Sequence, residues 1–280
     1  MKHKKLYGFL ALFASVLIWG TSFVVLKSTL DDVGVLTVLS MRFIIASIIF
    51  LAVCKINKLK FDKATLTGGL AMGLSLTFAY IFQTYGLYYT TPGKNAFLTA
   101  SYTILVPFMM WIISRKKPTV INLIAALICM TGIGLISLSD GFGNINIGDI
   151  LTLISGIFYG LQIIFIDINV SKSNVTALSA VQFTVSAIIC TLGALIFEPF
   201  SFAIDSLVLF KILYMGIFCT GICFFLQAWG QQYTAPNVAA VIMPLESVFG
   251  ALVSILFYGE IATRNFFIGA LLILIAIIIN

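Results

Sequence analysis

Long apolar runs separated by short polar stretches make up almost the whole chain. A helix that crosses the hydrocarbon core of a bilayer needs about 20 apolar residues. Runs of that kind predict ten membrane-spanning helices, at residues 6–27, 35–54, 66–88, 94–114, 119–138, 148–168, 175–197, 207–232, 236–258 and 264–280. The pattern therefore predicts an all-α integral membrane protein with short connections between its helices.

The second half of the chain repeats positions of the first half at a constant spacing. Six residues recur 144 positions later: Gln83 as Gln227, Gly86 as Gly230, Tyr89 as Tyr233, Thr90 as Thr234, Pro92 as Pro236 and Ala96 as Ala240. Nearer the start of each half the spacing is 140, so that Trp19 matches Tyr159 and Arg42 matches Gln182. A spacing of about half the chain length indicates that one structural unit is present twice.

A polar segment at residues 139–149, rich in Gly, Asn and Asp, is typical of a linker between the two units. It places the repeats at residues 1–140 and 147–280. Each repeat holds five predicted helices, and this odd number forces the second repeat to enter the membrane upside down. Inverted repeats are common in secondary transporters, which bind substrate near the middle of the membrane, between the repeats.

Composition favours lipid over water as the surroundings of this chain. Of its 280 residues, 61% are hydrophobic and only 9% are charged, which is more apolar than a soluble domain. The net charge of +6 comes from short loops, so it indicates membrane orientation and not nucleic-acid binding. With the N-terminus inside, eleven Lys and Arg residues fall in inner segments and four at outer ends. This bias predicts a multi-pass plasma-membrane protein with both termini in the cytoplasm.

The sequence carries no signature of an enzyme or of a metal site. It has no P-loop, no GxSxG and no HExxH motif. Its five cysteines lie in apolar runs, and the single histidine, His3, offers them no shared metal site. We therefore expect neither catalysis nor a bound metal or cofactor.

Polar and aromatic residues at helical spacing inside the apolar runs are candidates for a substrate site near the membrane midplane. The residues that we expect to converge there are Trp19, Phe23, Tyr80, Gln83, Asn95, Tyr102, Tyr159, Gln162 and Gln227. The alternative is structural, because aromatic residues fill cores and amides that join membrane helices contribute about 0.6 kcal/mol each. The sequence leaves both interpretations open.

Arg42 and Glu246 are ionisable residues deep within predicted helices. A charge at the centre of such a helix costs about 2.5–3.5 kcal/mol, so each needs a partner or a wet cavity. Arg42 could bind hydroxyls or carbonyls and fix helix packing. Glu246 matches Tyr102 of the first repeat, and because burial favours the neutral acid, it could exchange a proton or a cationic amine. Alternatively, it is held by backbone groups that Pro244 leaves free.

Two prolines are predicted to disturb their helices. Pro107 and Pro244 lie inside predicted spans, where each removes one backbone hydrogen bond. They predict kinks, which could serve as hinges for alternating access. Pro92 and Pro236 are instead expected in first turns, where a missing N–H does no harm.

Several short motifs point to one family of membrane proteins. They are WGTSF at residues 19–23, RF at 42–43, the segment 83–107, LESVF at 245–249 and GE at 259–260. Together they resemble the drug/metabolite transporter superfamily, in its ten-helix EamA-type branch, over nearly the whole chain. The resemblance implies a cavity between helices one to four and six to nine, with helices five and ten packed outside. It also implies relatives that export amino acids and other metabolites.

These observations predict a secondary transporter that exports a small amino-acid-like or other polar metabolite by alternating access. Its expected partners are a small-molecule substrate and membrane lipid, as a monomer or a homodimer, with proton coupling left open. The alternative is a lipid-carrier flippase or a membrane scaffold that transports nothing.

Overall fold

The computed structural model describes residues 2–90, 92–115, 117–137, 146–198, 205–258 and 263–279, and its regular structure there is helical. The elements are α1 (Lys2–Lys27), α2 (Val35–Ile56), α3 (Lys63–Tyr89), α4 (Pro92–Thr99), α5 (Tyr102–Ser114), α6 (Val120–Ser137), α7 (Ile147–Val170), α8 (Val175–Phe197), α9 (Ser206–Tyr214), the π-helix η1 (Met215–Ile222), α10 (Cys223–Gln231), α11 (Pro236–Ile242), α12 (Leu245–Tyr258) and α13 (Arg264–Ile279). The predicted all-α class is confirmed. The GE motif at 259–260 and most of the predicted linker lie outside the described residues.

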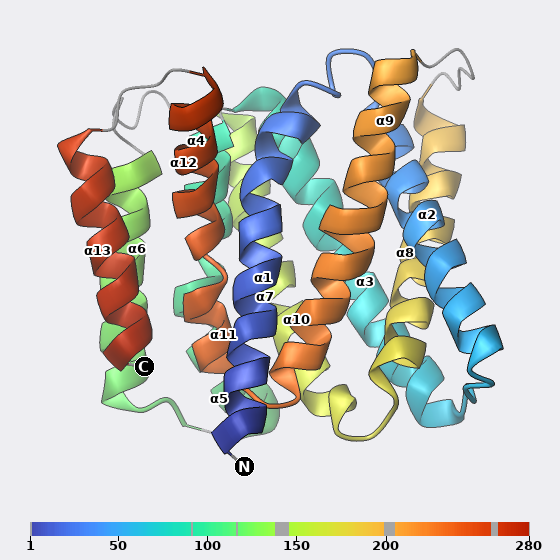
Figure 1. Cartoon of the computed structure of the whole chain (residues 1–280), viewed down its shortest axis with the longest axis horizontal. Helices are drawn as coiled ribbons and strands as arrows, with labels where there is room; N and C mark the ends of the chain where they lie inside the picture. Colours follow the sequence, from blue (N-terminus) through green and yellow to red (C-terminus); the bar gives the residue numbers. More distant parts are fainter. Residues whose placement is uncertain are drawn as a thin grey trace.

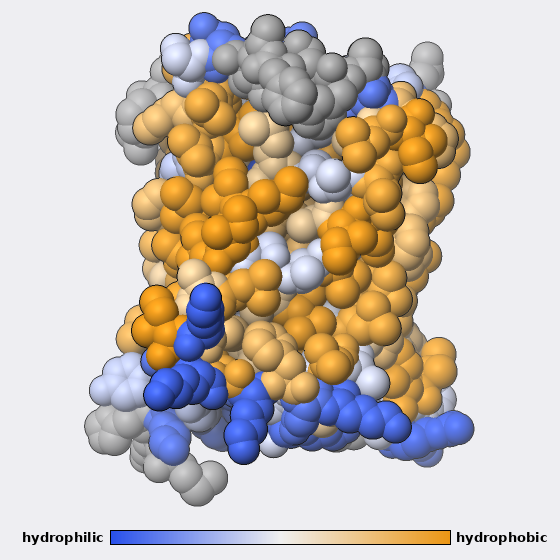
Figure 2. All heavy atoms as spheres, turned by 90° about the vertical axis from the view of Figure 1, so that its right-hand side faces the viewer, coloured by the Kyte–Doolittle hydropathy of each residue, from blue (hydrophilic) through white to orange (hydrophobic). Residues whose placement is uncertain are grey.

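Seven helical segments of the described chain are long and apolar enough to cross a membrane. They are residues 4–27, 35–56, 63–89, 95–114, 147–170, 175–197 and 206–231. Two shorter apolar helices, at residues 120–135 and 264–279, lie within the predicted spans 119–138 and 264–280. The predicted span 236–258 is divided between α11 and α12. On the face that Figure 2 shows, apolar side chains form a broad belt, with hydrophilic side chains gathered below it. The membrane class is confirmed, whereas the described part of the chain does not form ten unbroken helices.

Two predicted spans are broken at equivalent places in the repeats. Span 236–258 breaks at Met243 and Pro244, and span 94–114 breaks at Ala100 and Ser101. Ala100 and Pro244 are 144 positions apart. A break is therefore present at Pro244, where a kink was predicted, but in the first repeat it precedes Pro107, which lies within α5.

A hydrogen bond joins the helix break at Pro244 to the first repeat. Pro244 has no N–H, so the carbonyl oxygen of Ala240, four residues earlier, lacks its helical partner. The Thr103 hydroxyl of α5 donates to that oxygen at 2.9 Å. A buried carbonyl needs such a partner, and this bond fixes the broken helix against the first repeat.

The helices of the first half pack against those of the second half in the same way as the second half packs against the first. Helix α3 packs against α7 and α8, and in the equivalent way α10 and η1 pack against α1 and α2. The pairs α2 with α8 and α6 with α13 join equivalent helices directly. Figure 1 shows α6 and α13 together at one side of the molecule, and both chain ends toward the same end, which we call the terminal end. Helices α1 and α7 run in opposite directions, as inverted repeats require.

Candidate functional site

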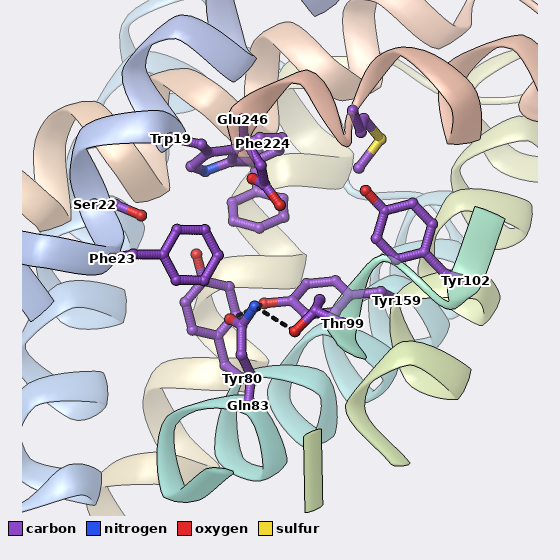
Figure 3. Close-up of a pocket in the computed structure, with 11 residues that line it drawn as sticks. Trp19, Ser22, Phe23, Tyr80, Gln83, Thr99, Tyr102, Tyr159, Phe224 and Glu246 are labelled. Atoms are coloured by element: carbon purple, nitrogen blue, oxygen red, sulfur yellow. Dashed lines mark hydrogen bonds between the residues drawn. The ribbon is translucent and has the colours of Figure 1, made fainter. Parts of the chain in front are cut away.

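A small cavity lies between the two repeats, beside both helix breaks. Its lining residues are Trp19, Ser22, Phe23, Tyr80, Gln83, Thr99, Tyr102, Tyr159, Phe224, Met243 and Glu246. They come from α1, α3, α4, α5, α7, α10, α12 and the break at Met243 (Figure 3). The cavity volume is about 30 Å³, which suits one or two water molecules.

The cavity is built from equivalent positions of the two repeats. Three pairs of lining residues are 144 positions apart: Tyr80 with Phe224, Thr99 with Met243, and Tyr102 with Glu246. Trp19 and Tyr159 form a fourth pair at the shorter spacing of 140. The cavity therefore lies where the axis that relates the two halves passes through the molecule.

Five aromatic rings follow one another around the cavity. The centroid distances are 4.9 Å from Trp19 to Phe224, 5.7 Å from Phe224 to Tyr80, 5.9 Å from Tyr80 to Tyr159 and 6.3 Å from Tyr159 to Tyr102. Adjacent rings are steeply inclined to one another, as aromatic pairs prefer. We call these five rings the aromatic arc. It gives the cavity an apolar wall with electron-rich ring faces.

The Gln83 amide is fixed within the cavity wall by neighbouring side chains. The Tyr159 hydroxyl donates to Gln83 Oε1 at 2.7 Å, and Gln83 Nε2 donates to the Thr99 hydroxyl at 3.2 Å. Behind it, Asn95 Nδ2 donates to the Gln83 backbone oxygen at 3.1 Å and to the Thr152 hydroxyl at 2.8 Å. These bonds join α3, α4 and α7 around one amide.

Trp19 is held by the π-helix of the second repeat. Its Nε1 donates to the Cys219 backbone oxygen of η1 at 2.7 Å. A π-helix shifts backbone hydrogen bonds by one residue, and such insertions are frequent at functional sites. The equivalent segment of the first repeat lies within the α-helix α3, so this anchor exists on one side of the cavity only.

Of the nine predicted site residues, six line the cavity and three do not. Trp19, Phe23, Tyr80, Gln83, Tyr102 and Tyr159 meet there, and their role in binding a substrate stays a prediction. Asn95, Gln162 and Gln227 are fully buried behind the wall. Gln227 Nε2 donates to Gln162 Oε1 at 3.0 Å, and Gln162 Nε2 donates to Gln182 Oε1 at 3.4 Å. This amide chain joins α7, α8 and α10.

The sequence analysis missed four lining residues: Ser22, Thr99, Phe224 and Met243. Phe224 could have been found, because it lies 144 positions after Tyr80. Thr99 and Met243 reach the cavity because the helix breaks beside them. A spacing rule alone gives no reason to select them.

Arg42 lies behind Tyr80 and does not line the cavity. Its side chain is 1% exposed, with Nε donating to the Thr220 hydroxyl at 3.1 Å and Nη2 donating to the Tyr80 hydroxyl at 3.2 Å. The guanidinium carbon is 4.9 Å from the centroid of the Tyr80 ring, a cation–π distance. Nη1 has no partner among the described residues. The hydroxyl partners agree with one of the roles weighed from the sequence.

The Glu246 carboxylate points into the cavity, beside Phe224 and toward Tyr102 (Figure 3). The residue is 9% exposed. Within the described chain, no side chain forms a hydrogen bond or an ion pair with this carboxylate. Titratable groups within its field are the hydroxyls of Tyr80, Tyr102 and Tyr159 and the thiol of Cys223, which are ordinarily neutral near pH 7.

Residues 6–138 and residues 146–280 each match the EamA-like transporter family. An uncharacterized transporter of Archaeoglobus fulgidus is 34% identical over 276 residues, which cover 99% of this chain and 86% of that protein. The uncharacterized transporter YoaV of Bacillus subtilis is 24% identical, with 97% of this chain and 95% of that protein covered. One solved crystal structure has a TM-score of 0.81 over 97% of this chain and 95% of its own, at 15% identity, which shows a shared fold alone.

Proposed function

Because this chain belongs to the EamA-like transporter family, we propose that it is a secondary transporter that exports a small amino-acid-like or other polar metabolite by alternating access. The repeats at residues 1–140 and 147–280 are its two moving units. The observation that carries this proposal is the cavity between the inverted repeats, lined by equivalent residues of both. A lipid flippase would need basic residues at its opening, and no Lys or Arg is among the described residues that line the cavity.

The terminal end faces the cytoplasm of the plasma membrane in this proposal. The helices α2 and α5 end there, so Lys55, Lys58 and Arg115 are at that end in sequence, whereas α1 ends and α9 begins at the opposite end, next to Asp31 and Asp205 (Figure 1). In a background without native cysteines, an impermeant thiol reagent outside the cell should label Asp205→Cys and spare Lys58→Cys. Labelling of Lys58→Cys alone would show that the terminal end faces the outside of the cell.

Close glycine contacts support alternating access, because the same close approach of two helices occurs at each end of the molecule. At the terminal end, a Cβ added to Gly8 would lie 2.8 Å from the Gly230 backbone oxygen. At the opposite end, a Cβ added to Gly148 would lie 2.7 Å from the Gly86 backbone oxygen. Gly8 and Gly148 are 140 positions apart, and Gly86 and Gly230 are 144 apart. The cavity of about 30 Å³ is too small for a metabolite, so transport requires it to widen, and we propose that the two glycine contacts are gates that open in turn.

Larger side chains at these glycines should hold opposite ends open. We expect Gly148→Val to expose a cysteine reporter at Ser22 to thiol reagents from outside, and Gly8→Val to expose it from inside. Gly193→Val is the matched control, since an added Cβ there meets only the flexible end of Leu36, at 3.3 Å. The measurement is the labelling rate in right-side-out and inverted vesicles. Identical labelling in the two test variants would contradict the two-gate arrangement.

The same variants test transport itself. Proteoliposomes are loaded with a metabolite extract, and solutes lost over time are identified by mass spectrometry. The wild-type protein should release a small polar solute at least tenfold faster than Gly8→Val or Gly148→Val, because each variant keeps one gate open. Equal retention in all three preparations would contradict a transport function.

We also propose that Glu246 carries the coupling proton. A carboxylate that lines a membrane cavity without a partner is costly while charged, and a proton removes that cost. The other titratable groups that face it are neutral hydroxyls and a thiol, and the buried cation Arg42 is bound to the hydroxyls of Thr220 and Tyr80 outside the cavity lining. Glu246 is therefore the cavity group best suited to gain and lose a proton.

A further inference from the structure

We propose that the substrate binds this cavity through a primary ammonium group with no carboxylate beside it, and that Glu246 pairs with that ammonium. This inference rests on the proposed transport function in treating the bound amine as cargo. It narrows the proposed class of substrate from amino-acid-like or other polar metabolites to amines that have an apolar or aromatic body.

The charge of the cavity wall favours a cation. Among the described residues that line the cavity, Glu246 is the only acidic or basic one. Arg42 is not among the described lining residues, and its guanidinium is already bound to the hydroxyls of Thr220 and Tyr80. A zwitterion or an anion would therefore place its carboxylate near Glu246 with no lining cation to balance it, and like charges at short range repel.

The aromatic arc favours the same group. Electron-rich ring faces attract ammonium groups, most strongly at tryptophan and when water is excluded. Trp19 and Phe224, at one end of the arc, lie beside the Glu246 carboxylate, and Tyr102 lies at the other end (Figure 3). Once a gate opens and the cavity widens, an ammonium paired with Glu246 is thus next to aromatic rings, and its apolar body can contact the remainder of the arc.

Tyr102 specifies a primary ammonium. Its side chain is 2% exposed, and its hydroxyl, which points into the cavity, has no hydrogen-bond partner among the described residues. Buried hydroxyls normally have a partner, so this one marks a position for a ligand atom. A primary ammonium has three N–H donors and can reach the Glu246 carboxylate and the Tyr102 oxygen together. A quaternary ammonium has no N–H and can use only the charge and the rings.

The test compares four probes that share one phenyl ring: phenethylamine, trimethyl(phenethyl)ammonium, phenylalanine and 3-phenylpropionate. Binding is measured calorimetrically on the full-length purified protein in detergent. We expect the two cations to bind at least tenfold more tightly than phenylalanine or 3-phenylpropionate. Glu246→Gln should lose at least tenfold in affinity for both cations, whereas Glu246→Asp, which keeps the charge, should lose less.

Tyr102→Phe separates the hydroxyl from the ring. It should weaken phenethylamine about 3- to 10-fold, as expected for one hydrogen bond, and leave the quaternary probe unchanged. An equal loss for both cations would assign Tyr102 a packing role and overturn the choice of a primary ammonium.

Three results would overturn the inference as a whole. They are equal or tighter binding of phenylalanine or 3-phenylpropionate, full cation affinity in Glu246→Gln, and no binding of either cation to the wild-type protein. Failure of the transport function looks different: cation-selective binding persists, but proteoliposomes release no solute. Conversely, release of neutral or anionic solutes without cation binding keeps the function and rejects the inference.

Discussion

Replacing Glu246 with glutamine is expected to reduce transport at least tenfold and to remove its pH dependence, while the protein stays folded. Glutamine has the shape of the protonated acid but can carry neither the charge nor the proton. Since no described side chain is bound to the Glu246 carboxylate, the substitution breaks no hydrogen bond in the fold. The loss should therefore fall on transport and leave thermal stability intact.

The sign of the pH effect follows from the charge. Protonation neutralises Glu246, so a cation loses its partner as the pH falls, and wild-type transport at low pH should approach that of Glu246→Gln. Transport is measured in proteoliposomes from about pH 5 to pH 9. This range includes the pH values at which buried carboxyl groups gain and lose their proton. An unchanged pH profile in Glu246→Gln would show that the coupling proton is carried elsewhere.

Asp62→Asn is the matched control for this experiment. Asp62 is exposed at the start of α3, where hydrogen bonds from the Thr65 side chain and backbone N–H lower the pKa of its carboxyl group. It therefore stays charged over the range tested and adds no pH dependence of its own. Asparagine is an equally good helix cap, so Asp62→Asn should preserve both the rate and the pH profile.

Replacing Arg42 with methionine is expected to reduce transport at least tenfold with little change in thermal stability. A charge within the membrane costs about 2.5–3.5 kcal/mol, and hydrogen bonds to a charged group return about 1.5–3 kcal/mol each. Arg42 makes two such bonds, to Thr220 and Tyr80, which return about 3–6 kcal/mol together, but its buried Nη1 has no partner among the described residues and costs about another 1–3 kcal/mol, so the favourable and unfavourable terms nearly cancel. Methionine fills the same space without a charge.

The loss of transport follows from the position of Tyr80. Because Arg42 Nη2 donates to the Tyr80 oxygen, the hydroxyl hydrogen of Tyr80 is directed elsewhere, and the ring is held in the cavity wall. Without Arg42, the hydroxyl group and the ring of Tyr80 become free to rotate. Arg42 is thus a positioning residue, and its removal should raise the substrate concentration for half-maximal transport more than it lowers the maximal rate.

Gln182→Met is the matched control, because Gln182 occupies the position of Arg42 in the second repeat. It is fully buried and accepts a hydrogen bond from Gln162, away from the cavity lining. We expect its transport to stay within about threefold of wild type, as for the loss of one interhelical amide bond. A fall in unfolding temperature that parallels the loss of transport in Arg42→Met would instead assign Arg42 to packing.

The sequence by itself determined the membrane class, the order of the helices and the doubling of the unit. These follow from patterns along the chain: apolar runs of bilayer length, and the recurrence of Gln83 as Gln227 and Pro92 as Pro236. It also identified most of the cavity wall, since Trp19 and Tyr159 are aromatic residues at equivalent positions of the two repeats and Tyr80 lies one helical turn before Gln83.

Tertiary structure alone decided which of the repeated residues reach the cavity. Gln83 and Gln227 are equivalent in sequence, yet one amide lines the cavity and the other bonds to Gln162 behind the wall. Likewise, Glu246 faces the cavity while Arg42 turns behind Tyr80. A helical period specifies the neighbours of a residue on its own helix. Its partners across helices depend on crossing angles, on the π-helix η1 and on the breaks at Ala100 and Pro244, and these arise only when the two repeats pack together.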